Sequence, residues 1–181
     1  MQIAIIGAGS FGTVLADIAA HNQCQVMMYA RRPEMVHVIN AFHRNPQYHP
    51  DLQLHASITA SSDLAEVVRG ADLVLLSVPS RAMDAICQAL AKVLAPDVAL
   101  LSTTKGIQSE GFQLMSQIIG QRLPSHPVGV LSGPNLAHEI AARHLTASVV
   151  ASQSPQVRQL ARDAFATKDF SLYRSEALIS V

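Results

Sequence analysis

Three glycines near the start of the chain have the spacing of a phosphate-binding turn. Gly7, Gly9 and Gly12 form a Gly-x-Gly-x-x-Gly motif between an isoleucine-rich apolar run and a run of helical character. In that setting the first glycine permits a tight turn, the second lets backbone approach a diphosphate, and the third lets the helix pack on the strand. The helix N-terminus presents free N–H groups and a positive dipole end to phosphates. The motif therefore predicts a dinucleotide site.

A pair of arginines follows the second apolar run and bears on the choice of cofactor. Arg31 and Arg32 stand where an NAD-specific site usually has an acidic residue, whereas arginine accommodates a 2′-phosphate. The nearby acid, Glu34, falls inside the helix expected to follow. We therefore predict NADP(H) as the favoured cofactor and NAD as the alternative, against the simpler interpretation of two solvated arginines.

Two later segments place polar groups after expected strands. Lys105 is positioned to bind a substrate phosphate, the cofactor or a polarised oxygen, or else to be an exposed lysine outside any P-loop motif. Gly133 and Asn135 belong to a second glycine turn before a helix, where N–H groups meet anions. Asn135 could also simply cap that helix.

Alternating elements must position these residues. The pattern predicts strands at residues 3–6, 25–29, 57–59, 72–78, 98–101, 128–131, 146–151 and 170–173. It predicts helices at residues 13–20, 33–42, 63–69, 80–94, 115–119, 136–143 and 155–166, with Ser80 as a cap and residues 43–55 irregular. This alternation indicates an α/β, Rossmann-like, doubly wound and mostly parallel sheet with helices on both faces, and ligands bind such sheets at the carboxyl ends of the strands.

Composition narrows the class of protein. The 181 residues suit one domain, residues 1–181, and 49% hydrophobic against 14% charged residues indicates a globular chain. Equal numbers of basic and acidic residues, 13 each, give no sign of a nucleic-acid or membrane-surface partner. Cys24 and Cys87 lie in apolar runs and are expected to be buried thiols, and the eight histidines lack metal-ligand spacing. With no signal peptide or apolar span, we expect a cytoplasmic protein that binds no metal.

Taken in order, the motifs resemble the N-terminal domain of bacterial NAD(P)-dependent glycerol-3-phosphate dehydrogenase. The matching stretches are residues 7–13, 29–32, 45–50, 78–80, 105–107 and 132–139. The resemblance implies hydride transfer between NAD(P)H and dihydroxyacetone phosphate, giving sn-glycerol 3-phosphate, and the reverse. It implies cofactor contacts at Ser10, Phe11, Arg31, Arg32, Tyr48, Lys105 and Ala137, and substrate contacts at Lys105, Gly133 and Asn135. A cationic Lys105 would stabilise charge developing on the carbonyl oxygen.

Two positions depart from the family pattern. Asn135 stands where the family usually has Ser or Thr, and His49 stands where it has leucine, which counts against a contact from the loop that holds Tyr48. The family's general-acid lysine lies near the start of an all-helical substrate domain, and the resemblance places it beyond Val181.

We therefore expect this chain to be the cofactor-binding half of the enzyme, inactive alone, with any oligomer contacts in the helical domain. The alternatives are a nucleotide-binding module without turnover, or another Rossmann dehydrogenase such as a ketopantoate reductase or a 3-hydroxyacid dehydrogenase.

Overall fold

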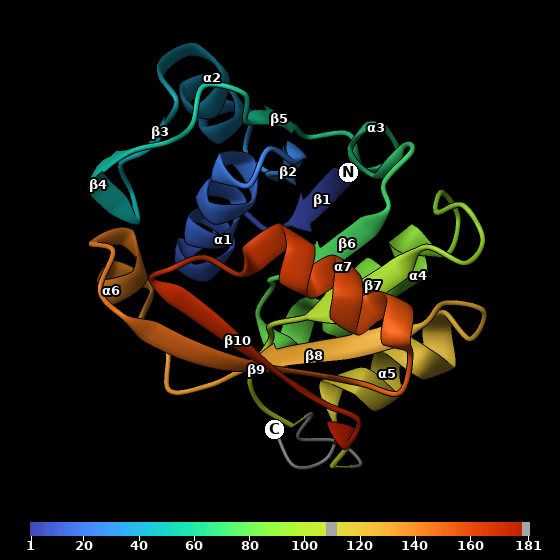
Figure 1. The fold of residues 1–181 in the computed structure, drawn as a ribbon. Coiled ribbons are helices and arrows are strands. Elements are labelled where there is room, and N and C mark those ends of the chain that lie inside the picture. Colours follow the sequence, from blue (N-terminus) through green and yellow to red (C-terminus); the bar gives the residue numbers. More distant parts are fainter. Residues whose placement is uncertain (108–111, 179–181) are drawn as a thin grey trace.

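The computed structural model describes residues 1–107 and 112–178, and a single large sheet forms its centre (Figure 1). Within these residues the sheet has eight strands in the order β10-β9-β8-β7-β6-β1-β2-β5. Neighbouring strands are parallel except for the pair β8 and β9. The strands are β1 (Gln2–Ile6), β2 (Gln25–Tyr29), β5 (Thr59–Ser61), β6 (Leu73–Leu76), β7 (Ala99–Ser102), β8 (Val128–Ser132), β9 (Thr146–Ser152) and β10 (Phe170–Ser175).

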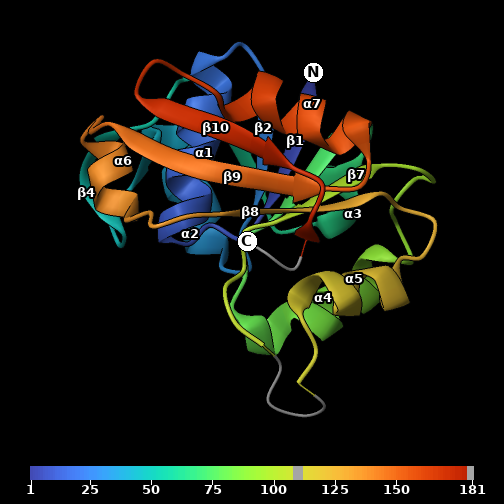
Figure 2. The same cartoon turned by 60° about the horizontal axis from the view of Figure 1, so that its bottom comes forward.

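Helices cover both faces of this sheet. Figure 2 shows α7 on one side and α4 with α5 on the other. One apolar cluster is shared by α1 (Ser10–His21), α2 (Pro33–Phe42), α6 (Ala137–Ala141) and α7 (Pro155–Phe165). The other is shared by α3 (Leu64–Val68), α4 (Met83–Leu90), which the short 3₁₀ helix η1 (Ser80–Ala82) precedes, and α5 (Met115–Arg122). The predicted α/β, Rossmann-like, doubly wound fold is confirmed.

Alternate side chains of the central strands supply the two clusters. On β1, Ile3 and Ile5 enter the first cluster, whereas Ala4 and Ile6 enter the second. Successive strand side chains point to opposite faces, and because both faces are covered the whole strand is apolar. Burial of each such isoleucine contributes about 1.5–3 kcal/mol. The strand ends that carry the polar loops are therefore held by a packed core.

Most element boundaries follow from local sequence signals. The helix α2 and the strand β2 begin and end at the residues expected, and Pro33 occupies the first turn of α2. At α7, the Ser154 side chain accepts a hydrogen bond from the Val157 backbone N–H at 3.5 Å, which is the usual contact of a serine N-cap. These signals act within a few residues, so the boundaries they set can be predicted from the sequence alone.

Three expectations about local structure were wrong. Residues 43–55 are not wholly irregular, because β3 (Arg44–Asn45) and β4 (His49–Gln53) pair as a small antiparallel sheet. The strand expected at 57–59 is β5, two residues later, where pairing with the edge strand β2 decides its position. The Ser80 side chain caps no helix: Ser80 opens η1, and the N-cap of α4 is Ala82.

The carboxyl ends of the central strands meet at one edge of the sheet. The strand β1 lies between β2 and β6, so the chain leaves it in opposite directions and opens a crevice at a topological switch point. Backbone hydrogen bonds tie these ends together. The Gly7 N–H donates to Tyr29 O at 3.2 Å, and the Ser77 N–H donates to Ile6 O at 2.9 Å.

Candidate functional site

The glycine turn between β1 and α1 has no room for larger residues at two of its three positions. Gly7 has a φ of +117°, and a Cβ there would lie 2.3 Å from Ser77 O. A Cβ on Gly12 would lie 2.3 Å from Gly7 O. The first and third glycines are thus explained by the packing of the turn against itself and against the loop after β6.

Gly9 differs because no described residue packs against the place where its side chain would stand. No atom of the described residues outside its immediate neighbours lies within 4 Å of a Cβ built on Gly9, and its φ of −84° suits any residue. Gly9 is also the N-cap of α1, and among residues 1–107 and 112–178 no side chain makes a capping hydrogen bond to this helix end. The turn therefore presents an open backbone surface and a positive helix end to the solvent side.

A cleft of about 420 Å³ lies over this surface. It gathers groups that are distant in sequence, and its lining includes Gly7, Gly9, Arg31, Arg32 and Tyr48. The loop after β6 and the start of α4 form much of the remaining wall, to which the end of β2 and Met35 of α2 also contribute. The structure therefore brings together five of the ten residues predicted to hold a dinucleotide; Ser10, Phe11, Gly12, Lys105 and Ala137 do not line this cleft.

The two arginines at the end of β2 are exposed at the cleft. Both line it, and the Arg32 guanidinium donates to Gln47 Oε1 in the loop between β3 and β4. Glu34 is exposed in the first turn of α2 and does not line the cleft. A third arginine, Arg81, also lines it. Sequence reasoning gave Arg81 no role, because only the fold brings η1 to the end of β2.

The small sheet of β3 and β4 is anchored to the glycine turn by two buried side chains. Asn45 Nδ2 donates to Ala8 O at 3.1 Å and to Thr13 Oγ1 at 2.8 Å. His49 Nε2 lies 3.0 Å from Ser10 Oγ and 2.9 Å from Ser10 O. His49 thus ties the loop that holds Tyr48 to the glycine turn, and the cofactor contact of Tyr48 stays a prediction. The two anchors were missed because they join residues 32 to 39 positions apart.

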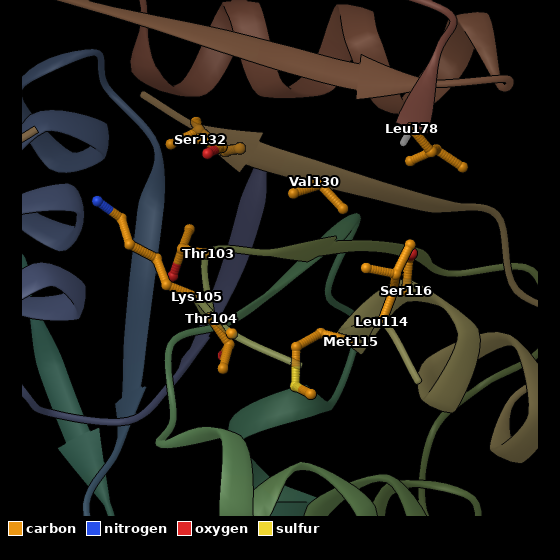
Figure 3. A pocket seen from close by; sticks show the side chains of 11 residues that line it. Thr103, Thr104, Lys105, Leu114, Met115, Ser116, Val130, Ser132 and Leu178 are labelled. Carbon is orange, nitrogen blue, oxygen red and sulfur yellow. The ribbon is translucent and has the colours of Figure 1, made fainter. Parts of the chain in front are cut away.

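A second, smaller cavity of about 280 Å³ lies at the ends of β7 and β8 (Figure 3). Lys105 lines it, and in Figure 3 its ammonium group points away from Leu114 and Met115. Lys105 Nζ donates to Gly133 O at 3.2 Å. The two strand-end loops singled out from the sequence are therefore in direct contact.

Asn135 does not cap α6, contrary to one interpretation of its position. The N-cap of that helix is Leu136, and the Asn135 side chain turns inward, with Nδ2 2.5 Å from Ser148 Oγ on β9. Asn135 is 7% exposed, and its Oδ1 has no hydrogen-bond partner among the described residues. A Cβ on Gly133 would lie 2.9 Å from Asn135 Nδ2, so this glycine makes room for the amide.

The remaining predicted contacts lie at helix starts beside the turn. Phe11 and Ala137 are half-buried and pack against the first apolar cluster, Phe11 from α1 and Ala137 from α6. Within residues 1–107 and 112–178, no group of three or more His, Cys, Asp or Glu residues is arranged to hold a metal ion. The same residues contain no helix with the length and apolar character needed to cross a bilayer.

Comparison with known proteins shows which family this chain belongs to. A family model described as the NAD-dependent glycerol-3-phosphate dehydrogenase N-terminus matches residues 2–158. The chain belongs to the glycerol-3-phosphate dehydrogenase family. A relative from Acinetobacter baumannii (strain SDF), "Glycerol-3-phosphate dehydrogenase [NAD(P)+]", is 39% identical over 176 residues, which cover 97% of this chain and 49% of the relative. The chain thus spans about half the length of the curated glycerol-3-phosphate dehydrogenases it matches.

Solved structures agree with this family. The glycerol-3-phosphate dehydrogenase of Coxiella burnetii matches with a TM-score of 0.93 and 29% identity, covering 98% of this chain and 55% of that one. A ketopantoate reductase from Ralstonia eutropha matches with a TM-score of 0.70 and 22% identity, over 98% of this chain and 57% of that one, and shares the fold alone. The family matches do not favour the reductase alternative.

Proposed function

We propose that this chain binds NADPH in the cleft over the glycine turn, as the cofactor-binding part of a glycerol-3-phosphate dehydrogenase. The observation that carries the proposal is the open backbone at Gly9 beneath a cleft lined by Arg31, Arg32 and Tyr48. The residues fit a dinucleotide because an uncapped helix end faces one part of the cleft and exposed cations face another.

Each part of the cleft has a distinct task in this proposal. The free N–H groups of α1, with Ser10 and Phe11 at its start, hold the diphosphate, and Gly9 leaves room for it. Arg31 and Arg32 hold the 2′-phosphate that separates NADPH from NADH. Tyr48 contacts the cofactor from the loop before β4. Lys105 does so from the loop after β7, and Ala137 from the first residue of α6.

We propose that dihydroxyacetone phosphate and sn-glycerol 3-phosphate are the substrates, interconverted at the ends of β7 and β8. The bound nicotinamide supplies or accepts the hydride. Lys105 stabilises the charge that develops on the carbonyl oxygen, since its flexible ammonium already reaches the loop of Gly133. The substrate contacts of that loop are assigned to Gly133 and Asn135 through the family resemblance. The Asn135 Oδ1 has no hydrogen-bond partner among the described residues, and neither residue lines the cavity of about 280 Å³.

Residues 1–181 act in this proposal as one NAD(P)-binding domain that does not turn over substrate alone. The proton donor for the carbonyl oxygen is assigned, through the family resemblance, to a lysine outside these residues. Purified chain mixed with NADPH and dihydroxyacetone phosphate is expected to leave the NADPH absorbance constant. Steady oxidation above the protein-free rate would contradict this part of the proposal.

The cofactor assignment is tested with the double variant Arg31→Ala/Arg32→Ala. Loss of charged hydrogen bonds to the 2′-phosphate should weaken NADPH binding by about 1.5–3 kcal/mol per bond, while NADH binding stays nearly constant. Calorimetric titration of both cofactors measures this difference. The matched control is Arg69→Ala/Arg162→Ala, which removes two exposed arginines outside the cleft and should leave both affinities unchanged. Equal losses for NADPH and NADH would refute the phosphate role.

A further inference from the structure

We propose that His49 is a positioning residue for the diphosphate site. It holds Ser10 so that the hydrogen of the serine hydroxyl is free to be donated to an anionic diphosphate. This inference rests on the proposed binding of a dinucleotide at the glycine turn. It gives a role to His49, whose departure from the family pattern counted against a contact from this loop.

The contact is made by one ring nitrogen of a buried histidine to a half-buried serine. His49 opens β4 and is 6% exposed, and its Nε2 lies 2.9 Å from Ser10 O and 3.0 Å from Ser10 Oγ. A single ring nitrogen therefore contacts both oxygen atoms of Ser10. Buried polar groups at such distances are hydrogen-bonded, and the partners determine which atom is the donor.

The carbonyl partner settles the position of the proton. A backbone carbonyl only accepts, so Nε2 must carry hydrogen to approach Ser10 O at 2.9 Å. Both the neutral Nε2–H tautomer and the imidazolium meet this condition, so Nε2 is the donor for either charge of His49. The same N–H faces Ser10 Oγ, which must then present a lone pair to it. The hydroxyl hydrogen of Ser10 consequently points elsewhere.

The position of Ser10 beside Gly9 places its hydroxyl next to the proposed diphosphate site, although Ser10 itself does not line the cleft. Ser10 is the first residue of α1 and is half-buried, and Gly9 before it lines the cleft. Asn45 holds Ala8 O on the other side of Gly9, so β3 and β4 fix the turn on both sides of the open position. A hydroxyl donor held there adds to the free N–H groups of α1. Hydrogen bonds to ionised phosphate oxygens are stronger than neutral ones.

The test compares His49→Leu, His49→Gln and Ser10→Ala with three probes: NADPH, ADP and 2′-AMP. ADP carries a diphosphate, whereas 2′-AMP carries only the phosphate assigned to the arginines. His49→Leu is expected to weaken NADPH and ADP about tenfold and to leave 2′-AMP unchanged, the size of one lost hydrogen bond to a charged group. His49→Gln should retain most of the affinity, because its Nε2 can still donate to the oxygens of Ser10.

Ser10→Ala should lose ADP affinity to a similar extent, and adding His49→Leu to it should cause little further loss, as for two residues acting through one group. The inference is overturned if His49→Leu binds ADP like the wild type. It is also overturned if ADP and 2′-AMP weaken equally, or if glutamine fails to rescue, because either result indicates a general structural role. Wild-type chain that binds none of the probes would overturn the proposed function itself.

Discussion

Asn45 and Thr13 lie 32 positions apart in sequence and are joined by a buried hydrogen bond of 2.8 Å from Asn45 Nδ2 to Thr13 Oγ1. Asn45 is fully buried, and its second bond reaches Ala8 O at 3.1 Å. Thr13 Oγ1 in turn donates to Gly9 O at 2.7 Å. The small sheet of β3 and β4 is therefore connected to the glycine turn through a continuous set of buried and partly buried hydrogen bonds.

Asn45→Ala is expected to destabilise the protein by about 1–3 kcal/mol, because it leaves buried acceptors of the turn without their donor. Urea unfolding measures this loss. In a double-mutant cycle with Thr13→Ala, the two losses should add up to more than the loss in the double variant. Strict additivity would show that the two side chains do not act as a unit.

Gly9→Ala is expected to lower the affinity for NADPH, whereas Gly12→Ala is expected to lower the stability of the fold. An alanine at position 9 meets no described atom within 4 Å, so the free energy of unfolding should stay within about 0.5 kcal/mol of wild type. The methyl group occupies space assigned to the diphosphate, so NADPH affinity should fall about tenfold or more.

At position 12 the added Cβ would lie 2.3 Å from Gly7 O, and overpacking of this kind destabilises by about 1–3 kcal/mol. Thermal unfolding and NADPH titration of both variants separate the two effects. Gly120→Ala, also in open space, is the control and should bind NADPH like the wild type. A Gly9→Ala variant with unchanged NADPH affinity would contradict the assignment of this space.

Local sequence signals predict the elements of this fold, whereas several contacts at the site depend on the folded chain. The order of strands and helices could be predicted because apolar periodicity, Pro33 and Ser154 act within a few residues. The glycine turn could be predicted because its three spacings are fixed by backbone sterics. The roles of Asn45, His49 and Arg81 could not, since each depends on segments that only the folded chain brings together.

Lys105→Ala is expected to weaken the binding of sn-glycerol 3-phosphate to chain saturated with NADP⁺. Removal of the ammonium should cost about 1.5–3 kcal/mol if it contacts the substrate, the usual size of a hydrogen bond to a charged group. Calorimetry on the cofactor-saturated protein measures this. Lys92→Ala removes an exposed lysine away from both cavities and should change nothing. Equal affinities for the two variants would remove Lys105 from the substrate site.

Ionisation of the buried Cys87 thiol is expected to lower the free energy of unfolding at alkaline pH. Burial, with a smaller effect of Asp84, raises the pKa of its thiol from the ordinary value of 9.0 to about 11. The unfolded chain therefore loses this proton at lower pH than the folded chain, and the stability due to the neutral thiol is complete below pH 9.0 and falls as the pH rises to about 11.

Urea unfolding of wild type and Cys87→Ala across this range tests the effect. The wild type should lose up to about 1–3 kcal/mol more than the variant between the two ends of the range. Parallel pH profiles of the two proteins would exclude Cys87 as the titrating group.

The most direct test of the central proposal is a titration of isotope-labelled protein with NADPH, followed through the backbone amide signals. Binding in the cleft predicts that the largest shifts fall on residues 7–12, 30–32 and 78–81, with little change at the opposite ends of the strands. The Gly9→Ala variant should need about tenfold or more NADPH to reach the same shifts. Shifts confined to other parts of the chain, or none at saturating NADPH, would contradict the proposed cofactor site.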